Sequence, residues 1–483
     1  MKKVVLFLAL CMSIASCKYS KSDVIVYQSP EGEELNEKYK VTVNGINVPV
    51  YNAKVCSEDQ KGRHDKEFDI AGFGSFDLKK GTVKVSVSVE DPIYTAKILP
   101  TSFGIMPTIK GKTVSFEVTK PQHITVEVNG EHIRSLHLFV NPEETNIPDP
   151  NDPNVIYFGP GIHEINSISV DDNKTIYIAG GAIVRGVLSE EEKEGRRVPA
   201  TFMLRGENIC FRGRGIYDQE QVPWAQGRRT MIATVNGFKM EGVIFSNSSQ
   251  WTLSMRNCND VHIDNVKVFG HRANADGINI SASLDVLVEN CFVRTWDDLI
   301  VVKTLRGSTQ EAGRIHVRKC VLYNDIAHAL SVGAEITQKV EDVLFEDCDV
   351  IADHGRCWTL RIYHTDAAVV KNVRFENIRI EESVQFASLW INTAVWTTDA
   401  KRGHIEDIVF KNITVNNSGY PLLREFEFSG FNAEHAINNV LIENVVINGR
   451  KIVQEDIKIN PTNERSARLG IVMNEFVYDV TVK

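Results

Sequence analysis

Four short apolar segments in the second half of the chain each follow a polar or aromatic residue. Asp276 precedes Gly-Ile-Asn-Ile, Asp298 precedes Leu-Ile-Val-Val, His328 precedes Ala-Leu-Ser-Val, and Trp358 precedes Thr-Leu-Arg-Ile. Asp297 lies next to Asp298. Carboxyl groups crowded together repel one another when ionised, so at least one of them keeps a proton near neutral pH. A protonated acid beside an ionised base is what cleavage of a glycosidic bond requires.

Each of these residues alone also has an ordinary structural explanation. Aspartate is common in turns because its carboxylate bonds to nearby backbone amides. A lone histidine such as His328 is often a surface or capping residue, although an imidazole near carboxyl groups can tune their protonation or bind a hydroxyl. The adjacent pair Asp297 and Asp298, in phase with Asp276 and His328, is what favours a catalytic site.

A repeat must position these residues. Nine-residue segments of one type begin at Asp260, Asp285, Arg314, Asp342, Asn372, Asp407 and Asn439, so that successive starts are 25 to 35 residues apart. Each segment alternates apolar and polar residues, turns at an Asn or Asp, and resumes with an apolar residue, whereas a helical repeat needs apolar spacings of three and four. This pattern predicts an all-β chain with a right-handed parallel β-helix over residues 151–483, one segment for each coil.

Two rows at fixed phases of the repeat support this prediction. The turn position holds Asn265, Asn290, Asp347, Asn377, Asn412 and Asn444, and only Lys319 breaks the row. Stacked turn amides can hydrogen-bond along the axis. The next position holds Val266, Cys291, Cys320, Cys348, Ile378, Ile413 and Val445. This mixture predicts an interior stack, in which the three cysteines are small buried apolar residues and neither disulfides nor metal ligands.

The same register predicts which side chains meet on the outside of the β-helix. We expect Ile278, Ile300, Leu330 and Leu360 to point inward, and Asn279, Val301, Ser331 and Arg361 to point outward. Asp276, Asp298 and His328 should then lie one above another, with Asp297 adjacent. The acidic residues would thus share one patch on the surface.

Four segments in this region resemble the signature of the polygalacturonases, glycoside hydrolase family 28. They are Asn274-Ala-Asp-Gly277, Asp297-Asp-Leu-Ile-Val-Val-Lys303, Ala327-His-Ala-Leu-Ser-Val-Gly333 and Arg361-Ile-Tyr363. The family shows Asn-Thr-Asp, then Asp-Asp, then Gly-His-Gly, then Arg-Ile-Lys. The resemblance covers roughly residues 151–483, with all four segments in order.

The resemblance implies roles for the residues at these positions. Asp298 would be the general acid, Asp276 and Asp297 would activate a water for an inverting displacement, and His328 would support the site. Neither a metal nor another cofactor is implied. Residues expected to contact the substrate are Asn274, Lys303, Arg361 and Tyr363, with Trp296 and Trp358 preferred over Trp224, Trp251 and Trp390 as aromatic platforms for sugar rings.

Two departures from the family pattern bear on the substrate. Tyr363 stands where the family has a lysine, and in polygalacturonases that lysine and the arginine together hold the substrate carboxylate. Ala327 and Ala329 replace both glycines around the histidine, which adds methyl groups to the floor of the pocket. A pectic substrate is favoured, but the loss of one cation weakens the case for plain polygalacturonate.

The region before the β-helix has a different sequence pattern. Residues 20–150 contain short alternating runs punctuated by Gly and Pro, which predicts an N-terminal antiparallel β-sandwich. A proline-rich linker at 146–153 ends it. Together with residues 155–161 and 175–182, this domain resembles that of the dextranases, glycoside hydrolase family 49, which share the aspartate triad but act on a neutral α-glucan.

The first residues are typical of an export signal. Met1-Lys2-Lys3 is followed by an apolar run too short to span a bilayer, and then by Ile14-Ala15-Ser16-Cys17. Small residues before a cysteine resemble a bacterial lipoprotein cleavage site, which predicts a signal over residues 1–17 and lipidation of Cys17. Plain secretion is the alternative. If Cys17 is lipidated, the protein would be an exported monomer held at the outer membrane, or facing the periplasm, by its lipid anchor alone.

Other classes of protein remain open at this point. The formal charge of −9 gives no electrostatic reason to bind nucleic acid. A hydrolase of an α-linked polysaccharide is the leading hypothesis. A polysaccharide lyase, in which the crowded aspartates bind Ca²⁺, and a non-catalytic carbohydrate-binding protein are the alternatives.

Overall fold

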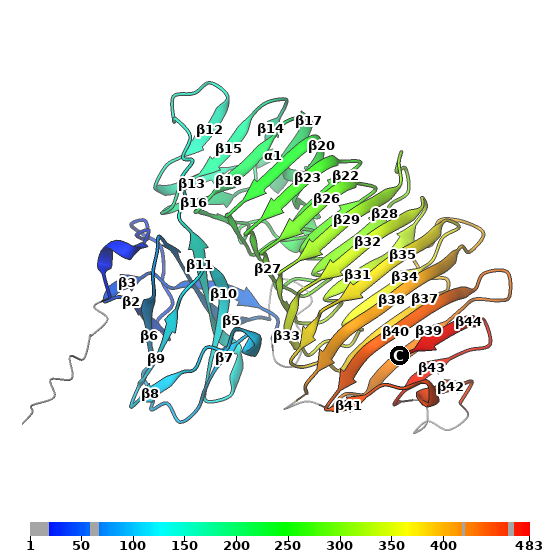
Figure 1. Ribbon diagram of the computed structural model, residues 1–483. Helices are drawn as coiled ribbons and strands as arrows, with labels where there is room; N and C mark the ends of the chain where they lie inside the picture. The colour runs from blue at the N-terminus through cyan, green and yellow to red at the C-terminus, as the bar shows by residue number, and fades with distance from the viewer. Residues whose placement is uncertain (1–18, 58–66, 418–420, 462–467) are drawn as a thin grey trace, which may run out of the picture.

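The computed structural model of this chain describes residues 19–57, 67–417, 421–461 and 468–483 (Figure 1). The expected signal and Cys17 lie outside the described residues, so lipidation stays a prediction. Within the described ranges, no helix is long and apolar enough to cross a membrane.

Two facing sheets form the N-terminal domain. One contains β1 (Val24–Ile25), β4 (Tyr51–Val55), β5 (Asp69–Leu78), β7 (Ala96–Leu99), β10 (Gln122–Val128) and β11 (Glu131–Pro142). The other contains β2 (Lys40–Val43), β3 (Ile46–Val48), β6 (Val83–Ser88), β8 (Thr108–Lys110) and β9 (Thr113–Val118). Alternate residues of these strands, such as Val83, Val85 and Val87, are buried between the sheets. The alternation seen in the sequence therefore builds this core.

One pairing in this domain differs from the antiparallel pattern that was expected. Strands β5 and β11 run parallel, with Phe73 opposite His137 and Phe76 opposite Val140. A parallel pair needs a crossover connection, and here the chain from residue 79 to 130 passes through the other sheet before it returns. The alternating sequence of the two strands is the same for either direction, so it could not reveal this.

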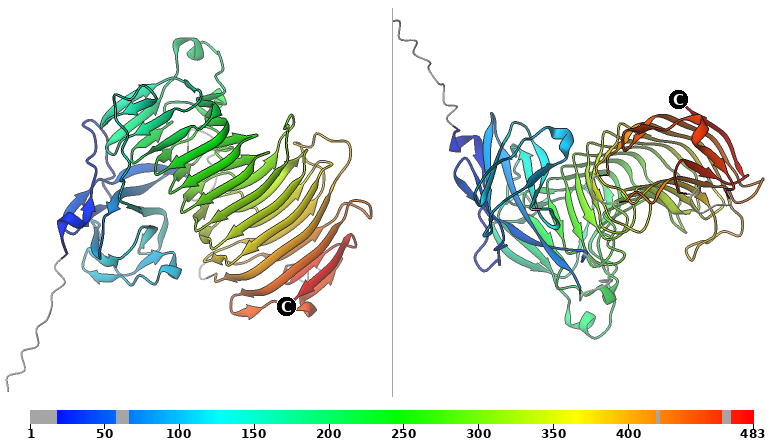
Figure 2. Two further views of the ribbon diagram at one scale, coloured as in Figure 1. Left: turned by 45° about the horizontal axis from the view of Figure 1, so that its top comes forward. Right: turned by 90° about the horizontal axis from the view of Figure 1, so that it is seen from below.

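The rest of the described chain forms one continuous parallel solenoid from β12 (Val155–Phe158) to β44 (Val477–Val482). Most strands pair in parallel with the strand three further along the chain, as β25 (Ile278–Ser281) does with β28 (Ile300–Thr304). Figures 1 and 2 show the coils stacked along one axis. The prediction of a right-handed parallel β-helix is confirmed.

The interior of the solenoid has the composition that the repeat predicted. Cys291, Cys320 and Cys348 are fully buried among aliphatic side chains, and none of them forms a disulfide. The turn row also forms a ladder in part: Asn412 donates to Asn377 at 3.1 Å, and Asn444 donates to Asn412 at 2.9 Å. All members of this row, including Lys319, have a positive φ near 50°. That conformation suits asparagine and aspartate better than lysine.

The cysteine row makes a prediction about stability. Replacing Cys320 with valine should change the free energy of unfolding by less than about 1.5 kcal/mol, because equivalent positions in other coils already hold Val266 and Val445. Denaturant unfolding monitored by circular dichroism measures this. A reducing agent should leave the unfolding midpoint of the native chain unchanged, and a marked drop would contradict the buried-thiol assignment.

One sheet of the solenoid, here called the site sheet, places the predicted residues. It runs through β22 (Leu253–Arg256), β25, β28, β31 (Leu330–Ile336), β34 (Leu360–His364) and β37 (Gln385–Ile391). Ile278 pairs with Ile300 and Ile300 with Leu330, and these side chains lie in the core. The expected inward row is therefore confirmed.

The N-terminal domain packs against the sheet next to the site sheet. Phe139 of β11 contacts Phe292 at 5.2 Å between ring centroids, and Phe73 of β5 contacts Phe269 at the same distance. Phe292 begins β27 (Phe292–Thr295), and Phe269 lies in β24 (Lys267–Gly270). Figure 2 shows the sandwich lying along the side of the solenoid. The turns that leave this covered sheet lead directly into the site sheet.

Candidate active site

The acidic residues lie in turns of adjacent coils, stacked as the sequence predicted. The backbone N–H of Gly277, next to Asp276, donates to the carbonyl of Asp298 at 2.8 Å. One coil further on, the N–H of Leu299 donates to the carbonyl of His328 at 2.9 Å. Gly277 is required here because a Cβ atom at this residue would lie 2.4 Å from the carbonyl oxygen of Leu299. The column of Asp276, Asp298 and His328 is thus built by backbone pairing.

A single ammonium group joins two of the carboxylates. The Nζ atom of Lys303 lies 3.3 Å from Asp276 Oδ2 and 3.4 Å from Asp298 Oδ2. It also lies 4.4 Å from the centre of the Trp251 ring, and the residue is only 5% exposed. Lys303 was predicted to contact substrate, but in the structure its ammonium group contacts the carboxylates of Asp276 and Asp298.

Backbone amides hold the third carboxylate. The N–H of Asn274 donates to Asp297 Oδ2 at 3.1 Å, and the N–H of Asp298 donates to Asp297 Oδ1 at 3.0 Å. Asn274 adopts φ +60°, a left-handed conformation that asparagine tolerates. The turn therefore fixes the direction of the Asp297 side chain.

Burial and mutual repulsion raise the pKa values in the cluster. The pKa of Asp276 lies well above its ordinary value, mainly because the side chain is removed from water. The charge of Lys303 lowers this pKa, and repulsion from Asp297 and Asp298 offsets part of that lowering. Burial, followed by the charge of Asp298, raises the pKa of Asp297 to about 6. Both raised pKa values favour retention of a proton within the cluster, as the crowding of carboxylates in the sequence suggested.

His328 is neutral and held from both sides. Its Nδ1–H donates to the carbonyl of Trp358 at 2.9 Å, so its Nε2 is the acceptor for Arg361 Nη1. Burial and then the charge of Arg361 lower the pKa of His328 to about 4. Nε2 lies 4.0 Å from Asp298 Oδ1. His328 therefore orients Arg361 beside Asp298 without adding a positive charge.

Arg361 lies beside two aromatic rings, which contact each other edge-on. Its guanidinium carbon is 4.2 Å from the centre of the Tyr363 ring and 5.4 Å from that of Trp390. The Tyr363 hydroxyl donates to the carbonyl of Thr393 at 3.1 Å, which fixes that ring. Tyr363 therefore supports the arginine from the position where the polygalacturonases have a second cation.

Two further arginines lie at the other end of the acidic cluster. The guanidinium carbon of Arg229 is 4.9 Å from the Trp251 ring, whose centre also lies near the Lys303 ammonium. Arg256 is in register with Ser281, which in turn pairs with Lys303. Within the described residues neither arginine forms an ion pair, and burial lowers the pKa of both. The cluster of carboxylates is thus flanked by cations at both ends.

The outward row of the site sheet contains polar atoms that are buried without a partner. They include both amide atoms of Asn279 and the hydroxyls of Ser281, Ser331 and Ser388, judged against the residues that the structure describes. Asn279 and Ser331 lie on either side of Val301 in the register. A polyhydroxylated ligand would supply the missing hydrogen bonds.

Two predicted aromatic platforms are not available as such. Trp296 is 8% exposed and packs with Cys56, Ala273 and Ile326 where the two domains meet. Trp358 is 3% exposed and lies edge-on to Trp390, 6.0 Å away between ring centroids. Both were preferred because they flank the proposed site in the repeat, but the turns direct their rings into the protein.

Sequence reasoning also missed the place of Lys303 as the counter-ion of the cluster. The signal was present, because Lys303 follows Val301 by two residues and must share its outward face. Trp251 and Trp390 were considered as sugar platforms but not preferred. Their rings instead contact the cations Lys303 and Arg361, at opposite ends of the site.

Comparison with known families supports the resemblance. Residues 225–395, which contain all four signature segments, match the family described as Glycosyl hydrolases family 28. An exopolygalacturonase of Zea mays is 25% identical over 271 residues, which is 50% of this chain and 63% of that protein. A second Zea mays exopolygalacturonase is 23% identical over 269 residues, with the same coverage. The chain thus matches less than two thirds of the length of these relatives.

Solved structures show the same fold at low sequence identity. The family 28 exopolygalacturonase of Yersinia enterocolitica aligns with a TM-score of 0.51 and 14% identity, covering 83% of this chain and 96% of that one. A polygalacturonase of Erwinia carotovora ssp. carotovora aligns with a TM-score of 0.51 and 17% identity, covering 67% and 86%. The predicted resemblance to the polygalacturonases is confirmed, and the family that matches is one of glycosyl hydrolases. The resemblance of the N-terminal domain to the dextranases stays a prediction.

Proposed function

From its polygalacturonase-like β-helix, we propose that this chain is an inverting glycoside hydrolase that cleaves an α-linked, uronate-containing polysaccharide of the pectic type. The observation that carries the proposal is the cluster of Asp276, Asp297 and Asp298 around one lysine, flanked by arginines. Such a site offers both a proton and a base within one patch.

The roles within the cluster follow the family resemblance. Asp298 would protonate the leaving glycosidic oxygen, and Asp276 with Asp297 would take the proton of a water attacking from the other face of the sugar. Lys303 lies about equally close to Asp276 and Asp298, so its ammonium stabilises whichever of the two is ionised. His328 and Arg361 are positioning and binding groups, since the neutral imidazole directs the guanidinium toward the bound sugar.

An acidic substrate is favoured over a neutral one by the unpaired cations. Arg361 at one end and Arg229 with Arg256 at the other form no ion pair with a carboxylate among the described residues, while Lys303 lies in contact with Asp276 and Asp298. A chain carrying carboxylates would pair with these arginines on both sides of the scissile bond. A neutral glucan, as in the dextranase-like alternative, would offer these three arginines no carboxylate to bind.

The calcium-dependent lyase alternative is disfavoured by the same lysine. A divalent cation shared by Asp276 and Asp298 would have to occupy the space that the Lys303 ammonium fills, and the two charges would repel. A non-catalytic binding protein has no need for carboxyl groups whose pKa values are raised by burial in one patch.

Substrate assays test the proposal directly. Release of reducing ends should be seen on polygalacturonate or partly esterified pectin and should be absent on dextran. Replacing Arg361 with alanine should raise KM for polygalacturonate at least about tenfold, since a charge-assisted hydrogen bond contributes about 1.5–3 kcal/mol. The exposed Arg314, on another sheet, provides a matched alanine control without effect.

Three results would contradict the proposal. Cleavage of dextran but not of uronate polymers would favour the neutral-substrate alternative. A product with the ultraviolet absorbance of a new double bond would show a lyase. Fresh product of the same anomeric form as the substrate, seen by NMR, would exclude inversion.

The pKa of Asp297 predicts how activity depends on pH. Because this carboxyl has a pKa of about 6 and must be ionised to activate water, kcat/KM should fall as the pH drops below about 6. Initial rates between pH 4 and 8, with protein stability checked at each pH, measure the acidic limb. A profile that stays flat from pH 7 down to pH 4.5 would mean that Asp297 is not the group whose ionisation limits the rate.

A further inference from the structure

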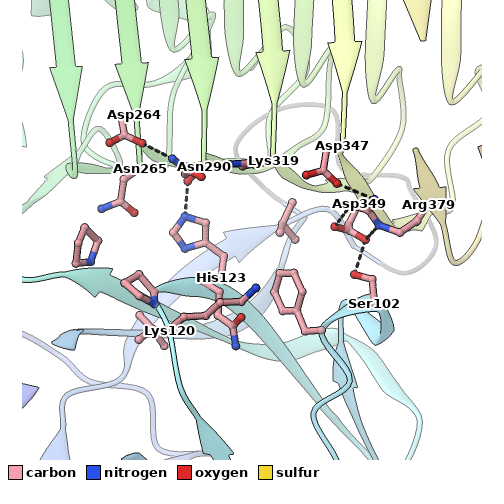
Figure 3. A pocket seen from close by; sticks show the side chains of 16 residues that line it. Ser102, Lys120, His123, Asp264, Asn265, Asn290, Lys319, Asp347, Asp349 and Arg379 are labelled. Atoms are coloured by element: carbon pink, nitrogen blue, oxygen red, sulfur yellow. Dashed lines mark hydrogen bonds and ion pairs between the residues drawn. The ribbon is translucent and has the colours of Figure 1, made fainter. Parts of the chain in front are cut away.

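A cleft lies between the N-terminal domain and the solenoid, on the opposite edge of the covered sheet from the active site. Its volume is about 590 Å³, which is within the range of sites for small ligands. Figure 3 shows its two walls: the turn row of the solenoid, with Asn265, Asn290, Lys319 and Asp347, and facing it His123 and Lys120 of the N-terminal domain.

This cleft coincides with the interruption of the asparagine row. In the C-terminal coils the row is a plain ladder of amides, as at Asn377, Asn412 and Asn444. Along the cleft it changes to Lys319 and Asp347, although a positive φ suits lysine poorly. The charged residues therefore occur where the row faces the second domain, and the structure of the ladder alone does not require them.

The charges in the cleft are paired unequally. Arg379 is neutralised by a bidentate contact with Asp349, at 2.6 and 2.7 Å, and by Asp347 at 2.8 Å. Asp264 accepts a hydrogen bond from the neutral amide of Asn290 at 2.7 Å and forms no ion pair among the described residues. Within the part of the chain that is described, Lys120 and Lys319 form no ion pair. Lys120 comes from the N-terminal domain and Lys319 from the solenoid. An anionic ligand could therefore contact one cation on each wall of the cleft.

Buried polar atoms at the cleft lack partners as well. His123 is 4% exposed, and its Nε2–H donates to the carbonyl of Asn290 at 2.6 Å, which leaves Nδ1 as an acceptor with no described donor. The amide nitrogen of Asn265, a residue that is 3% exposed, and the side-chain oxygen of Gln122 are also unpartnered. Donors and acceptors of this kind suit hydroxyl groups.

The remaining lining is apolar. Phe103, Pro121, Val140, Pro142 and Val321 line the same space. An aromatic ring and aliphatic groups beside polar atoms suit the face of a sugar ring, which has C–H groups on its surface and hydroxyls at its edge. Neighbouring coils are about 4.8 Å apart, so the stretch from Asn265 to Asp347 extends over roughly 14 Å.

We infer that this cleft, defined by Lys120, His123, Asn265 and Lys319, is a second, non-catalytic binding site for a short oligosaccharide that carries carboxylates. The two lysines would pair with carboxylates, and the unpartnered amide and imidazole would bond to hydroxyls. The choice of a uronate sugar over another anion rests on the proposed function. Binding here would also involve both domains at once and so stabilise their contact.

Calorimetric titration with trigalacturonate tests the site. The protein should be the full chain with Asp298 changed to asparagine, so that the probe is not consumed. Two binding events are expected. Lys319→Asn, which restores the residue type of the row, and Lys120→Ala should each weaken one event at least tenfold and leave the other unchanged. Lys239→Asn, which removes an exposed lysine from another surface of the solenoid, is the matched control.

The outcomes separate this site from the active site. A single binding event that Arg361→Ala weakens and Lys319→Asn does not would overturn the second site. Equal binding of neutral maltotriose would overturn its preference for carboxylates, and equal competition by inorganic phosphate would show a general anion site. Failure of the proposed function would appear instead as absence of turnover by the native chain, whatever the effect of Lys319→Asn on binding.

Discussion

Replacement of Asp298 by asparagine is expected to lower kcat on a uronate polymer by about 10³-fold or more, with little change in KM. General acid catalysis contributes about 10²–10⁴-fold, and the amide cannot donate a proton to the leaving oxygen. The amide has nearly the same shape as the carboxyl group, so contacts with the sugar should persist. Steady-state kinetics with reducing-end detection measure this effect.

The appropriate control is an exposed aspartate in another strand, β23 (Asn259–Asp264). Asp260 is exposed, has φ +53° and lies outside the cluster, and asparagine tolerates that conformation. Asp260→Asn should keep full activity. Asp276→Asn and Asp297→Asn should also lose activity if those carboxylates activate the water. An Asp298→Asn variant that folds and retains more than a tenth of the rate would remove Asp298 from the role of acid.

Replacement of Lys303 by methionine should impair both activity and stability. The lysine is the counter-ion of two buried carboxylates, and removing one partner of a buried ion pair costs about 3–5 kcal/mol. Its charge lowers the pKa values of Asp276 and Asp297, so both should rise when it is lost. The acidic limb of kcat/KM should therefore move to higher pH, with a fall of about 100-fold in rate near pH 6.

Two measurements distinguish this from a general loss of structure. Denaturant unfolding at several pH values gives the free energy of unfolding. The pH profile of kcat/KM, corrected for the fraction of folded protein, gives the catalytic effect. Lys339→Met, which removes an exposed ion pair with Glu341, should change neither. If Lys303→Met shows an unchanged pH limb, the lysine is not the charge that tunes the carboxyl groups, and a role in contacting substrate becomes the better explanation.

The solenoid could be predicted from the sequence because every coil repeats the same pattern of apolar alternation and turn residues. Alternation sets which side chains enter the core, and a residue with positive φ is needed at each turn, so Asn and Asp recur at one phase. Stacking then follows from the register, which brought Asp276, Asp298 and His328 together correctly. The N-terminal domain was less determined, because the direction of β11 beside β5 leaves no trace in an alternating pattern.

Within the site, the limits of prediction were set by side chains that cross between coils. The reach of Lys303 to two carboxylates depends on a side-chain rotamer, and its residue type suggested a substrate contact equally well. Trp296 and Trp358 flank the proposed site in the repeat, but whether a ring in a tight turn faces the groove or the protein interior depends on packing partners such as Cys56 beside Trp296. Those partners come from distant parts of the chain.

The unequal length of the coils has an evolutionary consequence. Strand register is maintained while the repeat varies from 25 to 35 residues, so the additional residues lie in loops, as in residues 392–403 between β37 and β38 (His404–Val415). That loop carries Val395 and Trp396, which are 91% and 55% exposed. Mutation can therefore lengthen or reshape one such loop while the catalytic turns of other coils keep their places. A scaffold of this kind allows descendants to diversify in the polymers they recognise while inheriting the same chemistry.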